Sequence, residues 1–391
     1  MHEGRVAVVG GGAAGLVAAI AAARLGARVT LLEGGARVGR KILASGNGRC
    51  NLTNLAVAPG SYNAPEFVRP TLAAIPCERV RAFFEQLGLP TYADDEGRVY
   101  PVTNAANSVL DVLRLECRHL GVEERCEFEV ARIARDGEAF ALFTFEGERV
   151  DAGAVVVATG GGASLLAELG HGQTPYAPAL VPLVTETEPI RGLSGVRVRC
   201  AASLLDAAGE PLATERGELL FRDYGVSGIM VLDLSRFYAV ASALSIDFFP
   251  ETDVAEMARL LADRRDGLGW RTAGEFFDGM LHTRVAKAVL RAADVAPDAS
   301  ASALDVARVA LLVKNFRVRV TGLGDPAQAQ VTRGGAALEE FDAATLESRR
   351  IAGLFAAGEV LDVDGRCGGF NLHWAWASGI RAGEAAAGGT R

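Results

Sequence analysis

Residues 5–33 read RVAVVGGGAAGLVAAIAAARLGARVTLLE, and this stretch decides the fold. The apolar run at 5–9 predicts a buried strand, and the alanine-rich segment after the glycines predicts a helix. Residues 28–32 predict a second strand, which leads into the acid Glu33. This order of strand, glycine turn, helix, strand and acid predicts the start of a dinucleotide-binding α/β domain.

The turn after the first strand places glycine at three positions for three steric reasons. Gly10 permits the tight turn from strand to helix, Gly12 lets the backbone approach a pyrophosphate, and Gly15 lets the helix pack closely on the strand. Ala13 and Ala14 begin the helix, where unpaired amide groups and the helix dipole attract phosphate. We therefore predict that the pyrophosphate of a dinucleotide binds at this turn.

Glu33 stands eighteen residues after Gly15, at the end of the second strand. Its carboxylate is placed to accept hydrogen bonds from ribose hydroxyl groups. A 2′-phosphate would be repelled there, which argues against NADP at this site. Glycine turns also occur for packing alone, but here the strand, the helix and the acid are all present.

Length and composition set broad limits on the protein. The chain has 391 residues, half of them apolar, so two or three domains with large cores are expected. The net charge of −8 comes without a basic run, which argues against nucleic acid as a partner. The first apolar run is broken by glycines and residues 13–23 are too few to span a bilayer, so we expect no secretory leader, no membrane span and a soluble cytoplasmic protein.

The six cysteines are scattered along the chain, with no CxxC pair and no metal-ligand cluster with histidine. We therefore expect reduced thiols and no metal site. The absence of two cysteines close together in the sequence also argues against a thiol-disulfide reductase.

Changes in hydrophobic period predict four segments. Residues 1–180 predict the first part of a Rossmann-like α/β domain with a parallel sheet. The period of two at 181–250 predicts an inserted antiparallel sheet or small barrel, and apolar residues three and four apart predict an inserted helical unit at 251–314. Residues 315–391 return to the β unit and then to the discontinuous α/β domain, ending in a helix whose tail is expected to fray from Gly383.

The segment 39–54, GRKILASGNGRCNLTN, is glycine-rich and polar, and we expect a loop rather than a helix. Over an extended cofactor, Arg40 and Lys41 can neutralise phosphate charge and the SGNG run can offer amide groups without side-chain bulk. A flexible surface loop is the alternative. Cys50 has no second cysteine or histidine nearby, which favours a small packing residue over a redox nucleophile. The cofactor candidates in the SGNG run are Gly46, Asn47 and Gly48.

A second glycine-rich stretch, ATGGG at 158–162, follows an apolar strand. Its spacing fails as a second fingerprint, because Leu165 stands where the last glycine belongs, so no second nicotinamide-binding Rossmann domain is expected. The end of this strand is expected to run beneath the first cofactor. The candidate contacts are Ala158, Thr159 and Gly160.

The segment 353–371, GLFAAGEVLDVDGRCGGFN, combines a buried strand, an acid and a glycine pair before a helix. Glu359, preceded by Gly358, can accept hydrogen bonds from a polyol chain. Gly368 and Gly369 can bring bare amide groups to N1 and the C2 carbonyl of a flavin, where negative charge gathers on reduction. This favours a flavin over a nicotinamide as the resident cofactor; a plain strand–turn–helix is the alternative.

Several other residues are candidates for a cleft. His373, Trp374 and Trp376 begin the last helix, although aromatic residues on a packed helix face more often belong to a core. The segments 97–101 and 222–224 also combine aromatic and charged side chains. None has a spacing that defines a reaction, so no catalytic acid or base is assigned.

The chain resembles the BaiN/RdsA-type (YhiN-like) family of bacterial NAD(P)/FAD-dependent oxidoreductases, within the glutathione-reductase and fumarate-reductase flavoprotein class. The resemblance runs from one end of the chain to the other, and SGNGRCNLTN and GEVLDVDG are highly specific to it. The matching segments are VVGGGAAGL, GRKILASGNGRCNLTN, EGRVYP, ATGGG, ALVPLV, YGVSG, QVTRGGAALEEFDAATLESRR and GLFAAGEVLDVDGRCGGFN.

This resemblance implies a tightly bound FAD held by the discontinuous domain. The ADP part would lie at residues 10–15 with its ribose on Glu33, and the isoalloxazine between the SGNGRCN loop and the turn at 368–371. By similarity to such FAD folds, the strand near Val130 touches the adenine through its backbone. The turn adds Phe370 and Asn371 to the candidate contacts.

The resemblance also implies that NAD(P)H, as a transient co-substrate, delivers hydride to flavin N5. A small organic acceptor, such as a conjugated alkene or ketone, then takes the electrons. This chain departs from the family in a shorter segment after ATGGG, and in His373, where many members have glutamine.

Three alternatives remain open. A fumarate-reductase-like alkene reductase would need an arginine proton donor, for which Arg49 and Arg366 are positional candidates. A flavin-dependent RNA-modifying protein is disfavoured by the acidic balance. A flavin-bearing binding or sensing protein would show little turnover.

Overall fold

The computed structural model describes residues 4–238, 242–329 and 331–388. It divides into two compact units, one formed by Met1–Ala177 with Val331–Arg391 and the other by Pro178–Gln330. The first unit is therefore discontinuous in sequence. The predicted boundary between β and helical domains, at residue 250, stays a prediction.

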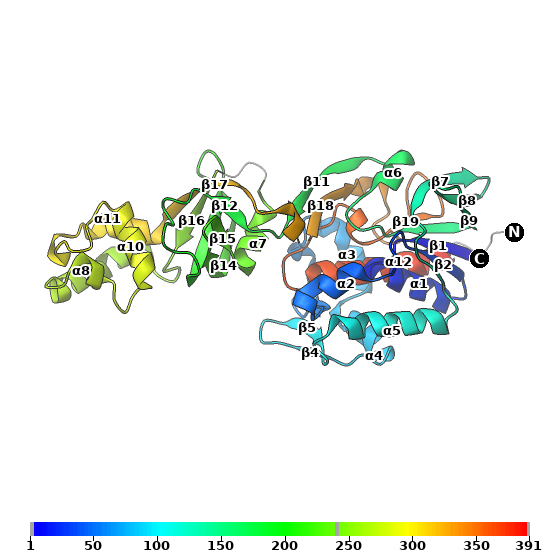
Figure 1. The fold of residues 1–391 in the computed structure, drawn as a ribbon, viewed down its shortest axis with the longest axis horizontal. Coiled ribbons are helices and arrows are strands. Elements are labelled where there is room, and N and C mark those ends of the chain that lie inside the picture. Colours follow the sequence, from blue (N-terminus) through cyan, green and yellow to red (C-terminus); the bar gives the residue numbers. More distant parts are fainter. Residues whose placement is uncertain (1–3, 239–241, 330, 389–391) are drawn as a thin grey trace. The chain divides into compact units, whose positions relative to one another are not determined.

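The first unit is built on a five-stranded parallel sheet in the order β19-β10-β1-β2-β6 (Figure 1). The central strand β1 is buried from Val6 to Val9 and pairs with β10 on one side and β2 on the other. A run of valines and alanine suits a strand covered on both faces. The strands are β1 (Arg5–Val9), β2 (Arg28–Leu32), β6 (Glu123–Arg125), β10 (Ala154–Val157) and β19 (Leu354–Ala356).

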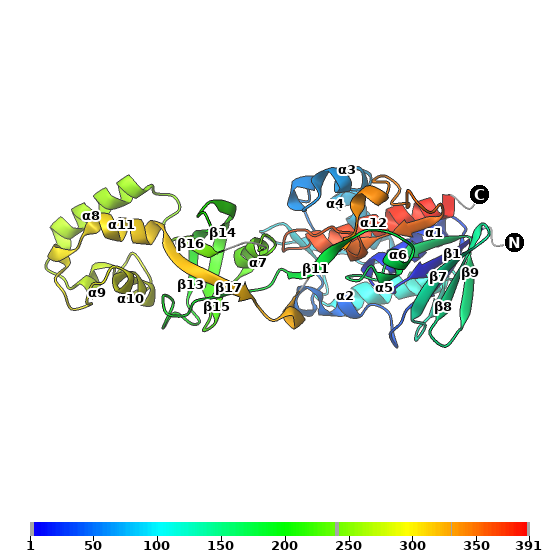
Figure 2. The same ribbon diagram turned by 90° about the horizontal axis from the view of Figure 1, so that it is seen from above.

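Helices and two smaller antiparallel sheets surround this sheet (Figures 1 and 2). A further pair, β11 (Gln173–Ala179) with β18 (Val331–Ala336), lies where the chain leaves and re-enters the unit. The small sheets are β3 (Thr53–Asn54), β5 (Arg98–Pro101) and β4 (Thr91–Ala93), and β7 (Val130–Asp136), β8 (Ala139–Thr144) and β9 (Arg149–Ala152). The helices are α1 (Ala13–Arg24), α2 (Arg40–Ala44), α3 (Pro65–Ala74), α4 (Cys77–Gln86), α5 (Ala106–His119), α6 (Ser164–Glu168) and α12 (Phe370–Gly388).

Helices α1 and α12 lie side by side and cross with almost no side chain between them. A Cβ at Gly379 would lie 2.3 Å from the carbonyl oxygen of Ala14, and one at Gly383 would lie 2.3 Å from that of Ala18. The expected fraying from Gly383 is wrong as far as Gly388, because Gly383 is held against α1 and the helix continues to Gly388; the rest of the tail, 389–391, lies outside the described residues.

The second unit contains a closed barrel in the order β12-β15-β14-β13-β16-β17, as the period of two predicts. Four helices are inserted between β16 and β17 and share one apolar cluster with the barrel. The strands are β12 (Leu183–Thr185), β13 (Arg197–Leu205), β14 (Pro211–Phe221), β15 (Gly225–Ser227), β16 (Ala243–Asp247) and β17 (Phe316–Leu323). The helices are α7 (Ile229–Ser235), within the barrel segment, and the inserted α8 (Val254–Leu268), α9 (Ala273–Phe276), α10 (Thr283–Ala292) and α11 (Val306–Lys314).

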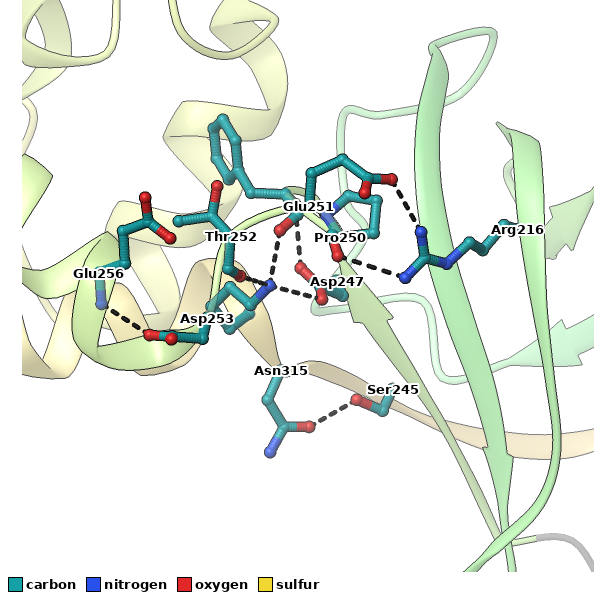
Figure 3. Close-up of polar contacts among 11 residues, drawn as sticks. Arg216, Ser245, Asp247, Pro250, Glu251, Thr252, Asp253, Glu256 and Asn315 are labelled. Carbon is teal, nitrogen blue, oxygen red and sulfur yellow. Dashed lines mark hydrogen bonds and ion pairs between the residues drawn. The ribbon is translucent and has the colours of Figure 1, made fainter.

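Lys314, at the end of α11, ties the barrel to the turn that leads into α8. Its Nζ lies 2.7 Å from the Asp247 carboxylate and donates to the Phe249 carbonyl at 2.6 Å and to the Thr252 carbonyl. Figure 3 shows Asp247 and Thr252 on either side of this ammonium group, with Asp253 capping α8 beside them. The side chain is only 8% exposed, so the ion pair is shielded from solvent.

Among the described helices, none has the length and the continuous apolar character that crossing a membrane requires.

Replacing Gly383 by alanine should destabilise the protein although alanine favours helices. We expect the free energy of unfolding to fall by about 2 kcal/mol or more, since the new methyl must displace α1. Gly267→Ala, in α8 where a Cβ would have no neighbour within 4 Å, should instead raise it by up to about 1 kcal/mol. Urea unfolding followed by circular dichroism measures both; equal effects of the two substitutions would contradict the tight crossing.

Lys314→Met should lower the free energy of unfolding of the second unit by about 2 kcal/mol, because a shielded carboxylate and two carbonyls lose their donor. Lys287→Met, at an exposed position of α10, should change it by less than about 0.5 kcal/mol. Thermal unfolding of the two variants beside the parent protein tests this, and matching transitions in all three would show that Lys314 contributes nothing.

Candidate functional site

The glycine turn after β1 has the steric requirements that the sequence predicts. Gly10 has φ 103°, and a Cβ there would lie 2.5 Å from the Ala158 carbonyl oxygen. A Cβ at Gly15 would lie 1.8 Å from the Gly10 carbonyl oxygen. Gly12, the N-cap of α1, instead faces open space, with no neighbour within 4 Å of a Cβ. The amide groups at Ala13 and Ala14 therefore begin a helix beside a gap that no side chain of the turn fills.

Glu33 is fixed by two backbone hydrogen bonds that sequence reasoning did not anticipate. The amide of Gly11 donates to Oε2 at 2.8 Å and the amide of Gly35 donates to Oε1 at 2.7 Å. Each carboxylate oxygen has a further lone pair with which it can accept a second hydrogen bond. The carboxylate thus holds the glycine turn and can still accept hydrogen bonds from ribose hydroxyl groups. Binding of a ribose by Glu33 stays a prediction.

The strand that carries Val130 lies next to Glu33. The amide of Phe128 donates to the Glu33 carbonyl at 2.9 Å, and β7 begins two residues later at Val130. Its adenine contact stays a prediction.

The expectation of a loop throughout 39–54 is wrong at its start, because α2 occupies Arg40–Ala44. Gly39, with φ 78°, turns the chain, and the next five residues, RKILA, are mostly good helix formers. The irregular backbone begins only at the glycines, where Gly46 and Asn47 both have φ 56° within the short 3-10 turn Ser45–Gly48. Arg40 is exposed and projects from the first turn of α2.

An ion pair brings three separately predicted motifs together. Lys41 Nζ lies 2.9 Å from Glu359 Oε2, and the amide of Thr332 donates to Glu359 Oε1 at 2.6 Å. Both groups lie beside Gly160, whose Cβ would be 3.4 Å from the ammonium and 3.7 Å from the carboxylate. Lys41, the ATGGG turn and Glu359 thus meet at one place.

The segments that follow β10 and β19 flank the Lys41–Glu359 ion pair, and hydrogen bonds hold them to the sheet and to α12. The amide of Ala158 donates to the Val9 carbonyl at 2.8 Å, and the Thr159 hydroxyl donates to the Gly162 carbonyl at 2.9 Å. Gly358, with φ 76°, donates its amide to Ser378 Oγ and accepts a hydrogen bond from Trp374 Nε1 through its carbonyl.

The SGNGRCN loop and the turn at 368–371 are packed against each other at Gly369, and the implied place of the isoalloxazine between them stays a prediction. A Cβ at Gly369 would lie 2.5 Å from the Thr53 carbonyl oxygen and 2.7 Å from Asn51 Oδ1. Gly368 is more open, with the Asn54 amide nitrogen 3.7 Å from its Cβ position. Gly369 is therefore needed for packing on the loop, whereas Gly368 leaves its backbone accessible from one side.

Side chains on both sides of this turn hold its shape. Asn54 Nδ2 donates to the Gly368 carbonyl at 3.0 Å, and the Tyr62 hydroxyl donates to the Phe370 carbonyl at 2.9 Å. Asn371 Oδ1 accepts from the Gly365 amide at 2.7 Å. The N-terminus of the 19-residue helix α12 is thus fixed at the loop.

Asn51 and Asn54 are contacts that sequence reasoning missed, although both lie in the quoted loop. Two buried side-chain atoms in the described part of the chain lack a hydrogen-bond partner, Asn51 Oδ1 and His373 Nε2. Asn51 packs against Gly369 of the turn. His373 Nδ1 lies 2.8 Å from the hydroxyl of Thr53, whose carbonyl also packs against Gly369. One asparagine lies two residues before β3 and the other lies within it, and neither position gives a sequence pattern that would have identified the contact.

Cys50 is an unreactive packing residue. It is fully buried, and burial raises the pKa of its thiol to about 12. A thiol that stays protonated is a poor nucleophile. The adjacent Arg49 is exposed, with its guanidinium 4.8 Å from the ring centroid of Tyr100.

The remaining candidates are divided between the two units. Trp374 and Trp376 are buried core residues of the first unit. The cluster at 222–224 belongs to the second unit, where Arg222 and Asp223 line a surface cleft with Glu188 and neighbouring residues.

The parallel sheet, the glycine turn and the acid after β2 define a dinucleotide-binding protein of the Rossmann type. The family model described as the HI0933-like protein Rossmann domain matches residues 4–385, and the chain belongs to this family.

The relatives match along almost the whole chain. A protein of Clostridium scindens named 3-dehydro-bile acid delta(4,6)-reductase is 35% identical, over 98% of this chain and 99% of its own. A ribosomal RNA dihydrouridine synthase of Escherichia coli is 30% identical, over 95% of each. Among solved structures, a flavocytochrome c3 fumarate reductase has a TM-score of 0.48 at 18% identity, covering 99% of this chain and 78% of its own.

Burial lowers the pKa of His373 to about 4, so this histidine is neutral in the folded protein at neutral pH. The unfolded chain takes up this proton near pH 6.5. The folding stability that the shift contributes is therefore present above that pH and lost as the pH falls towards 4, by up to about 3 kcal/mol.

His373→Gln should make the free energy of unfolding less dependent on pH between about 4 and 6.5. Urea unfolding of both proteins at pH 7 and pH 4.5 measures the difference, with His119→Gln, at an exposed position of α5, as control. An unchanged pH dependence in His373→Gln would mean that folding does not lower the pKa of this histidine.

Proposed function

We propose that the protein is an FAD-dependent reductase that takes hydride from NAD(P)H and reduces a carbon–carbon double bond conjugated to a carbonyl in a small organic acceptor. The observation that carries this proposal is the full-length identity of 35% with a protein named as a delta(4,6)-reductase. Membership of the HI0933-like family supports FAD as the cofactor.

The residues of the first unit fit the parts of FAD. The open backbone at Gly12 and the start of α1 suit the pyrophosphate, and Glu33 suits the adenosine ribose. Lys41 and Glu359 suit a phosphate and the ribityl chain. The turn at 368–371 suits the pyrimidine end of the isoalloxazine, where α12 directs the positive end of its dipole.

The bound flavin would supply the hydride chemistry. The protein's own contribution is to fix the ring between the loop and the turn, and to stabilise the negative charge that reduction places near N1 and the C2 carbonyl. No side chain is assigned as the proton donor to the acceptor. The cysteines at 50, 77, 117, 126 and 200 are free thiols, which suits the reducing cytoplasm.

The names of the relatives support one class of acceptor. A delta(4,6)-reductase acts on carbon–carbon double bonds, and dihydrouridine is uridine with one ring double bond reduced. Both names describe the addition of two electrons and two protons to such a bond. We therefore place the acceptor among conjugated alkenes.

RNA is the second candidate acceptor. It is favoured by relatives of Escherichia coli and Haemophilus influenzae named ribosomal RNA dihydrouridine synthase, at 30% and 28% identity. It is disfavoured by the net charge of −8 and the absence of a basic run in the sequence, since RNA binding draws on clustered lysine and arginine.

We expect the purified protein to be yellow and to be bleached by NADH or NADPH without oxygen. Reoxidation by a 3-oxo-Δ4,6 steroid acid should then be faster than by a protein-free ribosomal RNA transcript, with a saturated 3-oxo steroid acid as the unreactive control. Visible absorbance in a stopped-flow instrument measures both steps.

Other outcomes would replace this proposal. Reoxidation by RNA alone would select the RNA-modifying function. A yellow protein that neither nicotinamide bleaches would indicate a binding or sensing protein with little turnover. Equal reoxidation by the saturated control would exclude a reductase of double bonds.

A further inference from the structure

Arg49 presents a guanidinium group that is held in place but lacks an acceptor. Its amide donates to the Gly46 carbonyl at 3.2 Å, and the next residue, Cys50, is buried. Arg49 itself is exposed, and its guanidinium carbon lies 4.8 Å from the ring centroid of Tyr100. Among the residues that the structure describes, this guanidinium has no hydrogen bond and no carboxylate partner. Its five N–H donors are therefore available to a ligand.

The ring that holds Arg49 lies on a face of the small sheet that borders the proposed flavin site. Arg98 and Tyr100 are two residues apart on β5, so their side chains point to the same face of that sheet. Arg98 Cγ lies 3.9 Å from the Cβ position of Gly368, whose carbonyl accepts a hydrogen bond from Asn54. This face therefore extends from the Gly368 turn, where the pyrimidine end of the flavin is proposed to lie, to the guanidinium of Arg49.

The second arginine on this face, Arg98, is already neutralised by acidic residues. Its Nε lies 2.8 Å from Asp94 and its Nη1 lies 3.0 Å from Glu96. The charge of Arg98 thus stabilises its own hairpin. Arg49 has no such partner in the described chain, and its contact with the ring of Tyr100 fixes the direction of its charge. An uncompensated positive charge with a fixed direction is suited to an oxygen that is negative or becomes negative.

The proposed reaction produces such an oxygen. Hydride from the reduced flavin adds to the β carbon of the double bond, and the π electrons of that bond move towards the carbonyl oxygen to give an enolate. A proton from solvent then adds to the α carbon, which completes the transfer of two electrons and two protons. A donor fixed beside the oxygen stabilises the enolate more than the ketone. A guanidinium does not give up its proton, so it suits this task and not that of the proton donor.

We propose that Arg49 is a catalytic residue whose guanidinium binds the carbonyl oxygen of the acceptor and stabilises the enolate that forms when hydride is added. This rests on the proposed reduction of a double bond conjugated to a carbonyl. Arg49 then restricts the acceptors to compounds in which the double bond is conjugated to an oxygen that can carry the charge.

The first measurement is the reoxidation of the reduced full-length protein by a 3-oxo-Δ4,6 steroid acid. Arg49→Met should lower the rate at saturating acceptor by about 100-fold or more, because the donors to the enolate oxygen are lost. Arg49→Lys keeps a positive charge and should recover part of that rate. Arg132→Met is the matched control, since Arg132 is likewise exposed and lies 4.4 Å from the ring centroid of Phe143, and it should keep the parent rate.

A phenol that resembles the enolate tests the same contact without turnover. 4-Chlorophenol carries the charge of its ionised form on one oxygen, and this phenolate gives a charge-transfer band with an oxidised flavin. The pH at which the band appears should be lower in the parent than in Arg49→Met by about one unit or more, because a nearby cation lowers the pKa of the bound phenol. Arg132→Met should titrate as the parent does.

Each other result overturns the proposal at a defined point. Equal reoxidation rates in the parent and Arg49→Met would leave the reductase standing and exclude Arg49 from stabilising the enolate. A slower Arg49→Met with an unchanged phenol titration would give Arg49 a structural role only. Loss of the yellow colour in Arg49→Met would assign this residue to the binding of FAD. A parent protein that no conjugated ketone reoxidises would remove the proposed function, and this inference with it.

Discussion

The contact between α1 and α12 is the constraint on which the rest of the first unit depends. Two glycines of α12, Gly379 and Gly383, rest on the carbonyl oxygens of Ala14 and Ala18, and Gly358 meets the methyl group of Ala14. No larger side chain fits at these points. Helix α1, whose amide groups would bind the pyrophosphate in the proposed site, is thereby held against α12, whose start adjoins the turn at 368–371.

The contact between α1 and α12 fixes the distance between the two ends of the proposed cofactor site. The glycine turn lies at the N-terminus of α1, and the turn at 368–371 lies at the N-terminus of α12. Because the helices cannot slide past each other without a collision at the glycines, the distance between these ends is fixed by backbone contact. A long, flexible dinucleotide is best held by such a rigid frame, since little further ordering is needed on binding.

The parts of the fold that could be predicted from the sequence are those with a local cause. The glycine turn follows from steric rules within a few residues, and the barrel follows from the period of two. The pairing of Lys41 with Glu359 could not be predicted, because 318 residues separate them and only the folded first unit brings them together. The contact between Asn51 and Gly369 could not be predicted for the same reason, because the two residues come from opposite ends of the chain.

The discontinuity of the first unit has a consequence for the order of events during synthesis. The edge strand β19, the acid Glu359 and the whole of α12 are made after the second unit, which is complete by residue 330. A nascent chain that lacks them can offer a dinucleotide only the turn after β1 and the groups beside it. The complete flavin site of the proposal therefore forms only after α12 has been made, so the nucleotide domain of a growing chain lacks an edge strand and a helix until then.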